Sequence, residues 1–366
     1  MARLIQAEDM EQIALGAAVL GTGGGGNPYV GKLIAMEALQ KHGPVTMVDI
    51  SEVKDDDLIV PSAMMGAPTV MVEKIPKGDE IIRAFQALER ALGRRITHTM
   101  SIEAGGLNST TPFSVAATLG LPLVDCDAMG RAFPEIQQVT LTMYGISATP
   151  FTLADEKGNS LLINTINNVW TERFARTATV EMGCSAMLAC YPMTGKQLKE
   201  AAVAGTLTKC QEIGRAIQQA HRDKTDPVGA VARVTGGFRI FKGKVADVRR
   251  GTVSGFARGE AVLDGQDHLA GRTCRVKFQN EFLAAVTAEG VLCSAPDLIT
   301  MLDVESGEPI TTEELRYGFR IEMLGIPCDH RWRTPAGLKL VGPRYFGYDF
   351  DYVPVEALAD GIRPGT

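Results

Sequence analysis

Through the first third of the chain, short apolar runs alternate with segments whose apolar residues recur at helical intervals. The clearest amphipathic segment is DEIIRAFQALERAL at residues 79–92, which ends at Gly93. The pattern predicts further helices at residues 8–20, 28–42 and 112–119, and strands at residues 45–50, 58–60, 95–103 and 121–124. Strands that alternate with helices favour a parallel sheet with helices on its faces. We therefore expect an α/β fold for this part of the chain.

The pattern changes after about residue 170. A helical arm at residues 195–222 precedes residues 236–350, where short β-like runs are separated by glycine. Turn signals at such regular spacing are typical of an all-β barrel or sandwich. At roughly 100–200 residues per domain, a chain of 366 residues suggests two domains. We predict an α/β domain over residues 1–170 and a β-rich domain over residues 171–366. The boundary stays open across residues 170–235, because the helical arm can pack on either domain.

The charge balance narrows the class of partner. The 37 basic and 43 acidic residues give a net charge of -6, whereas proteins that follow nucleic-acid phosphates carry a basic excess. No apolar run approaches the roughly 20 residues that cross a bilayer, and residues 1–12 lack the layout of a signal peptide. The 7 cysteines include no CxxC pair, which is typical of reduced thiols. We expect a cytoplasmic protein with a small-molecule substrate and with neither a nucleic-acid nor a membrane partner.

A run of glycines, GTGGGG at residues 21–26, stands between two predicted helices. It matches GxGxxG, and Asp49 follows at roughly the spacing of a ribose-binding acid, so a nucleotide-binding oxidoreductase is one alternative. The dinucleotide fingerprint needs a strand before the glycines, however, and a helix precedes them here. Consecutive amides before a helix form an anion-binding nest, and we assign substrate binding to Gly23, Gly24, Gly25 and Gly26. A tight helix–helix turn is the structural alternative.

Polar side chains gather where two predicted strands end. Glu103 opens the loop EAGGLN, which contains Asn108. Asp125 and Asp127 lie in VDCDAMGR, which ends at Arg131. Open α/β sheets bind ligands at the carboxyl ends of their strands, and neighbouring carboxylates raise one another's pKa, which suits acid–base catalysis. We predict that one catalytic rim is formed by Glu103, Asn108, Asp125 and Asp127. Arg131 is their expected counter-charge. The alternatives are a helix cap for Asp125, a surface ion pair for Arg131 and a solvated Glu103.

Two further patterns stay open between structure and function. The triplet QNE at residues 279–281 interrupts two apolar runs, which fits either a strand bulge or side chains directed at a cleft. The same two interpretations, a structural one and a functional one, stay open for Glu181. The sequence contains no HxH, HExxH or paired-cysteine spacing, so a divalent metal such as zinc would need ligands from distant loops. The cofactor is therefore undetermined.

Several longer segments, taken together and in order, resemble one family. They are GTGGGGNP at residues 21–28, VDCDAMGRAFPE at 124–135, QNE at 279–281, APDLITMLDVESG at 295–307 and WRTPAGLKLVGPRYFGYD at 332–349. The chain resembles the S-methyl thiohydantoin desulfurase family, formerly a domain of unknown function, whose members often accompany hydantoinases. The resemblance spans nearly the whole chain. It implies an αβα sandwich followed by a β-barrel-like domain.

The resemblance also implies a reaction, in which water replaces the S-methyl group of a five-membered thiohydantoin ring and leaves a hydantoin and methanethiol. A related cyclic amide or amidine substrate stays open. In such a hydrolase Asp125, Asp127 or Glu103 would activate water, or a metal-bound hydroxide would replace that base. The glycine amides or Asn108 would stabilise the tetrahedral intermediate, and Arg131 would hold a substrate carboxylate. On this hypothesis Asp127→Asn abolishes turnover. A non-catalytic partner of a hydantoinase is the remaining alternative, and we expect a homo-oligomer.

Overall fold

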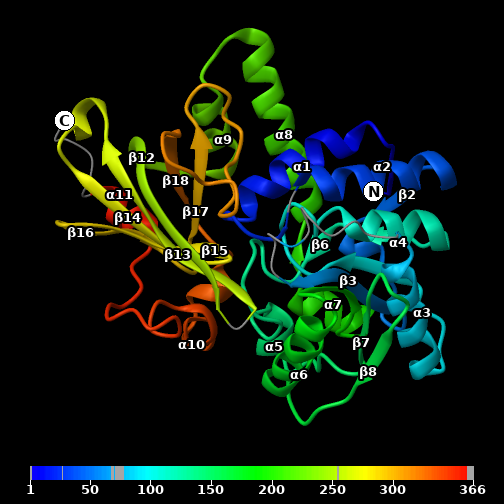
Figure 1. The fold of residues 1–366 in the computed structure, drawn as a ribbon. Helices are drawn as coiled ribbons and strands as arrows, with labels where there is room; N and C mark the ends of the chain where they lie inside the picture. The colour runs from blue at the N-terminus through cyan, green and yellow to red at the C-terminus, as the bar shows by residue number, and fades with distance from the viewer. Residues whose placement is uncertain (1, 27, 67–69, 71–77, 254, 361–366) are drawn as a thin grey trace.

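The computed structural model describes residues 2–26, 28–66, 70, 78–253 and 255–360. They form two principal sheets that lie side by side (Figure 1). The first, which we call the large sheet, is covered by helices on both faces, and the second, the curled sheet, is antiparallel. This arrangement confirms the expected αβα sandwich followed by a β-rich, barrel-like part.

The large sheet has nine strands and is mixed. In spatial order they are β1 (Arg3–Ile5), β2 (Val45–Val48), β5 (Leu123–Val124), β4 (His98–Ser101), β3 (Leu58–Gly66), β9 (Ser185–Ala189), β7 (Phe151–Ala154) and β8 (Ser160–Ile163), with β10 (Met193–Thr194) paired to β3. The block β2–β5–β4–β3 is parallel, and the other pairs are antiparallel. The predicted parallel sheet is therefore correct for this block alone, because strict strand–helix alternation stops after β5.

Helices bury both faces of the large sheet. On one face lie α3 (Glu80–Leu92) and α4 (Thr111–Leu119), and on the other α5 (Thr140–Met143), α6 (Asn168–Glu181) and α7 (Gly195–Ala201). Alternate residues of a strand point to opposite faces. In β3, Leu58 and Val60 accordingly pack with α3, whereas Ile59 and Ala63 pack with the second group. This two-sided burial explains the continuous apolar run of β3.

The junction between the sheets is helical. The glycine run joins α1 (Asp9–Leu20) to α2 (Pro28–His42), while α8 (Thr206–Asp223) packs along α1 and leads through α9 (Pro227–Thr235) into the curled sheet (Figure 1). Close packing of α1 on α8 depends on Gly16, where an added Cβ would overlap the backbone of Cys210. The helical arm thus packs on α1, and both helices share a core with Leu298 and Leu302 of the curled sheet.

The curled sheet has seven strands. Their order is β16 (Gly290–Ser294), β15 (Glu281–Thr287), β14 (Thr273–Gln279), β13 (Phe256–Gly265), β12 (Phe238–Val253), β18 (Arg320–Ile326) and β17 (Leu298–Asp303). The sheet bends until β15 and β16 lie against β17, and its concave face encloses a separate apolar core. Helices α10 (Pro335–Val341) and α11 (Val355–Asp360) follow it.

The large sheet extends further along the chain than the expected first domain. Both β9 and β10 lie past residue 170 and still pair with β3. The division of the chain at residue 170 stays a prediction. Among the described residues, no helix combines the length and the apolar character needed to cross a membrane.

Candidate active site

The glycine run lets three distant backbone segments approach one another. An added Cβ at Gly25 would overlap the Gly105 backbone, and one at Gly24 would overlap the Glu281 carboxyl group. Gly23 lies in the same way against the Phe282 ring, and its φ of 84° is one that glycine adopts readily. The carbonyl oxygen of Gly25 accepts hydrogen bonds from the backbone N–H groups of Leu107 and Asn108 at 2.9 and 3.3 Å. The run is thus more than a tight turn, because it seats the loop after β4 and the curled sheet.

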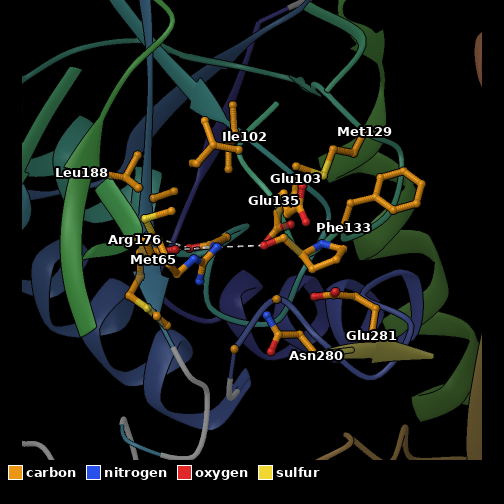
Figure 2. Close-up of a pocket in the computed structure, with 18 residues that line it drawn as sticks. Met65, Ile102, Glu103, Met129, Phe133, Glu135, Arg176, Leu188, Asn280 and Glu281 are labelled. Carbon is orange, nitrogen blue, oxygen red and sulfur yellow. Dashed lines mark hydrogen bonds between the residues drawn. The ribbon is translucent and has the colours of Figure 1, made fainter. Parts of the chain in front are cut away.

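These segments enclose a cavity of about 60 Å³, which we call the inner cavity. Gly25 and Gly26 form one part of its wall, and the ends of β3, β4 and β9 form another. Figure 2 shows charged and amide side chains from different elements entering this space, with Met65, Ile102 and Leu188 as apolar wall. The cavity therefore lies at the carboxyl end of the parallel strands β3 and β4, where open α/β sheets place their ligands.

Glu103 and Asn108 are fixed at the edge formed by β3 and β4. Glu103 follows β4 by two residues and is buried. The Asn108 side-chain amide donates to Glu103 Oε1 at 2.7 Å and to the Met64 carbonyl at 3.2 Å, and its Oδ1 accepts from the Met64 N–H at 2.7 Å. Because Met64 fixes which end of the amide is the donor, Asn108 presents an N–H to Glu103. Glu103 and Asn108 thus lie in the same cavity wall as Gly25 and Gly26.

A second glutamate faces the same cavity from the curled sheet. Glu281 begins β15, and the polar triplet Gln279–Glu281 forms the tip of the β14–β15 hairpin. Its side chain is buried, and Glu281 Oε2 has no hydrogen-bond partner among the residues that the structure describes. A buried carboxyl oxygen without a partner is costly unless it is protonated or meets a ligand. Of the triplet, Asn280 and Glu281 line the inner cavity, whereas Gln279 lies outside its described lining.

The two glutamates influence each other's protonation. Burial raises the pKa of Glu103 to about 7, against the hydrogen bonds from Asn108 and Phe133 and the positive charge of Arg131. Burial raises the pKa of Glu281 well above its usual range, and the charge of Glu103 raises it further, while Arg131 opposes this. The surroundings of Glu281 thus favour its protonated form, while Glu103 can take up or release a proton near neutral pH. Such a pair can act as general acid and general base.

Comparison with known families covers nearly the whole chain. Residues 8–165 match the model described as "S-Me-THD-like, N-terminal domain", and residues 166–355 match "S-Me-THD-like, C-terminal domain". The chain belongs to the S-methyl thiohydantoin desulfurase family. Among solved structures, this family member is similar to a crystal structure of a protein from Chromobacterium violaceum, a target of the Northeast Structural Genomics Consortium. The TM-score is 0.80 at 25% identity, over 96% of this chain and 100% of the other. No curated protein matches the sequence.

In this family member, Asp125 and Asp127 lie outside the described lining of the inner cavity. Asp125 accepts hydrogen bonds from the backbone N–H groups of Leu207 and Thr208, at the start of α8, and from the Thr208 hydroxyl. Asp127 accepts from the N–H of Gly130 and from the Thr206 hydroxyl, both at distances below 3 Å. The expected shared rim is therefore wrong for both aspartates. The chain after β5 pairs as β6 (Cys126–Asp127) with β11 (Val203–Ala204), which turns both carboxylates toward the positive end of α8.

The sequence predicts that Arg131 balances the charge of the rim and holds a substrate carboxylate, but Arg131 lies outside the described lining of the inner cavity. Its side chain is fully buried, and its N–H groups donate to the carbonyl oxygens of Ala132, Pro296, Asp297 and Phe282 and to the Thr22 hydroxyl. These five bonds use all five guanidinium N–H groups, so none is left to hold a substrate carboxylate. Burial lowers the pKa of Arg131 to about 10, which leaves it charged at neutral pH. Arg131 thus ties the two sheets together and supplies the positive charge that the glutamate pair feels.

Sequence reasoning missed several residues around the site. Glu281 was singled out only as an open question, and Glu135 and Arg176, which also line the inner cavity, gave no signal. Arg176 lies on α6, and its guanidinium contacts the Pro134 carbonyl as well as Gly255 and the Phe256 ring at the β12–β13 hairpin of the other sheet. Glu181 lies in the lining of a neighbouring, larger cavity.

A metal site in this protein would need ligands from segments that are distant in sequence. Across the described parts of the chain, no group of three or more His, Cys, Asp or Glu residues is arranged to hold a metal ion.

The helix α1 leads directly into Gly21–Gly26, so the strand that a dinucleotide fingerprint requires before its glycines is replaced here by a helix.

Proposed function

We propose that the protein hydrolyses a five-membered cyclic amidine, most specifically an S-methyl thiohydantoin, to the hydantoin and methanethiol. The observation that carries the proposal is the buried glutamate pair, in which Glu281 Oε2 faces a cavity without a hydrogen-bond partner in the described residues. Membership of the S-methyl thiohydantoin desulfurase family supports the substrate class. The raised pKa values support the division of roles between Glu103 and Glu281.

In the first step of the proposed reaction, ionised Glu103 removes a proton from water while the water oxygen bonds to the ring carbon that carries the S-methyl group. The electron pair of the C=N bond moves to the ring nitrogen, which takes the proton of Glu281. Placing acid and base on opposite sides of one bond avoids building full charge in a buried site. The product of this step is a neutral tetrahedral intermediate that carries both a hydroxyl and the S-methyl group.

In the second step the C–S bond breaks. The departing sulfur takes the proton held by Glu103 and leaves as methanethiol, while the hydroxyl of the intermediate returns its proton to Glu281 and becomes the ring carbonyl. Both carboxyl groups thereby regain their starting states: one hydrogen of water ends on sulfur, and the other replaces the proton that Glu281 gave to the ring nitrogen. Asn108 acts as a positioning residue, because its amide hydrogens go to Glu103 and to Met64. Anion binding by the amides of Gly23–Gly26 stays a prediction.

The test uses the purified full chain and S-methyl thiohydantoin in water enriched in oxygen-18. We expect methanethiol in the gas phase and a hydantoin that carries a single heavy oxygen, because the proposed reaction takes its oxygen from water. Detection of volatile methanethiol avoids interference from the 7 cysteines of the chain. A protein that releases no methanethiol, or a hydantoin without the heavy oxygen, would contradict the proposal.

A further inference from the structure

We propose that a second cavity beside the active site binds an apolar substituent on the sp³ carbon (C5) of the substrate ring. This outer chamber is lined by residues of α6 together with Phe256 and Tyr345 and has a volume of about 580 Å³. The inference rests on the proposed function, because it concerns what the substrate carries in addition to the reacting ring.

The two cavities adjoin and differ greatly in size. Glu135 and Arg176 belong to the lining of both. The inner cavity has a volume of about 60 Å³ and the outer chamber one of about 580 Å³. A bulky group on the substrate ring therefore has no room beside the glutamate pair. The adjoining outer chamber, nearly ten times larger, is the space that such a group can reach.

The groups at the boundary are held in place by the protein. Arg176 Nε donates to Glu172 at 2.8 Å, its Nη2 donates to the Pro134 carbonyl at 2.9 Å, and its guanidinium lies 4.2 Å from the centre of the Phe256 ring. The Tyr345 hydroxyl donates to Glu135 at 2.6 Å. The boundary is thus built before substrate arrives, since its charged groups already have partners.

The chamber wall favours an apolar occupant over a charged one. Val169, Val180 and the ring of Phe256 supply apolar surface. Glu172 is paired with Arg176, and the remaining carboxylates, Glu135 and Glu181, outnumber the one further cation of the lining, Arg173, which disfavours an anionic substituent. An aryl or branched alkyl group bonded to C5 fits this lining, because it gains apolar contact and leaves the ion pair intact.

The test uses a substitution that fills the outer chamber with a bulky side chain. Val180→Trp places a large ring in the chamber, and Val353→Trp is the matched control, because both valines are 42% exposed and Val353 lies outside the chamber lining. The probes are hydantoin and 5-benzylhydantoin in a calorimetric binding titration, together with turnover of the two corresponding S-methyl thiohydantoins.

For the unaltered chain we expect 5-benzylhydantoin to bind about tenfold or more tightly than hydantoin, from the apolar area that the benzyl group buries. In Val180→Trp that preference falls by a comparable factor, both in binding and in kcat/KM, whereas in Val353→Trp it is unchanged. An equal preference in the unaltered chain and in Val180→Trp overturns the inference. If no thiohydantoin is turned over, the proposed reaction is wrong. The binding preference then still tests whether the outer chamber binds the substituent.

Discussion

At the scale of single residues, the protonation of the two glutamates in the inner cavity depends on burial and on a nearby buried arginine. Glu103, Glu281 and Arg131 are all buried, and the arginine lies outside the cavity wall with its donors taken by carbonyl oxygens and a hydroxyl. Two ionised carboxylates against one guanidinium would leave an uncompensated charge in a medium of low polarity. A proton on one glutamate removes this cost, and the proposed reaction uses the same proton.

Replacing either glutamate by its amide should stop the reaction without unfolding the protein. We expect Glu281→Gln and Glu103→Gln each to lower kcat roughly 100- to 10,000-fold, the usual contribution of one general acid or base. The thermal midpoint should stay the same or rise, because a buried ionisable group is replaced by a neutral one of similar size. Steady-state kinetics and calorimetry measure both effects. Glu308→Gln, at an exposed position, serves as the control and should match the unaltered chain.

The pH profile should be bell-shaped. Activity should fall as pH drops through about 7, where Glu103 takes up its proton, and should fall again at high pH, where Glu281 loses its own. The direction in which stability changes with pH also follows, because a carboxyl whose pKa is raised on folding binds more protons in the folded state. The stability that the pair contributes is complete below the ordinary pKa of glutamate and is lost as pH rises through the folded values. A profile with no acidic limb above pH 5 would remove Glu103 as the base.

Asp127→Asn tests the rejected aspartate rim. Because Asp127 holds a turn and the start of α8 rather than the cavity, we expect kcat per folded molecule to stay within about twofold and stability to fall by about 1 kcal/mol. Kinetics normalised to the folded fraction separate the two effects. Complete loss of turnover in folded protein would restore the aspartate to the mechanism.

Among the single residues, Glu103, Asn108 and the glycine run could be found from sequence because strand ends and loop composition are local signals. Glu281 could not be placed, since nothing local says that the β14–β15 hairpin meets the end of β4. Asp125 was misplaced for a related reason. Its strand end looks like that of Glu103, and only the pairing of β6 with β11 turns it away.

At the scale of elements, the glycine run works by the absence of side chains. Gly25 has a φ of 73°, and an added Cβ would overlap the Gly105 backbone, which cannot move without displacing the loop that holds Asn108. The helices of the first third of the chain were predictable: α2 has the expected bounds, and Gly93 ends α3 in the left-handed conformation with a φ of 59°. The mixed order of the large sheet was not predictable, because antiparallel pairing of β9 with β3 depends on contacts distant in sequence.

Gly25→Ala should therefore damage stability and activity together. We expect a loss of about 2 kcal/mol or more, from the unfavourable φ and the backbone overlap. Urea unfolding measures the loss. Gly251→Ala is the control, because nothing lies within 4 Å of an added Cβ there and its φ is not positive, so its midpoint should stay unchanged or rise slightly. An unaltered midpoint in Gly25→Ala would show that the segments need not approach so closely.

At the scale of the whole molecule, Arg131 links the two sheets. It joins Thr22, near the large sheet, to the carbonyl oxygens of Phe282, Pro296 and Asp297 in the curled part. The expectation of a homo-oligomer and that of a hydantoinase partner stay predictions at this scale.

Two substitutions at Arg131 separate its structural and electrostatic effects. Arg131→Met leaves several buried carbonyl oxygens without donors, which should cost roughly 3 kcal/mol or more. It also removes the charge that lowers the pKa of Glu103, so the acidic limb of activity should move to higher pH. Arg131→Lys should lose stability as well but keep the acidic limb in place, because the charge remains. Identical limbs in the two variants would show that the guanidinium does not act on the pair.

Glu103 is carried by one half of the molecule and Glu281 by the other, which has a consequence for the ancestry of the family. Neither half could have been borrowed as a finished catalyst, because each contributes a single carboxyl. On the proposed mechanism, activity therefore requires both halves. Chimaeras that combine halves of two relatives would test this dependence. We expect such a chimaera to be inactive where the hairpin that carries Glu281 does not fit the end of β4.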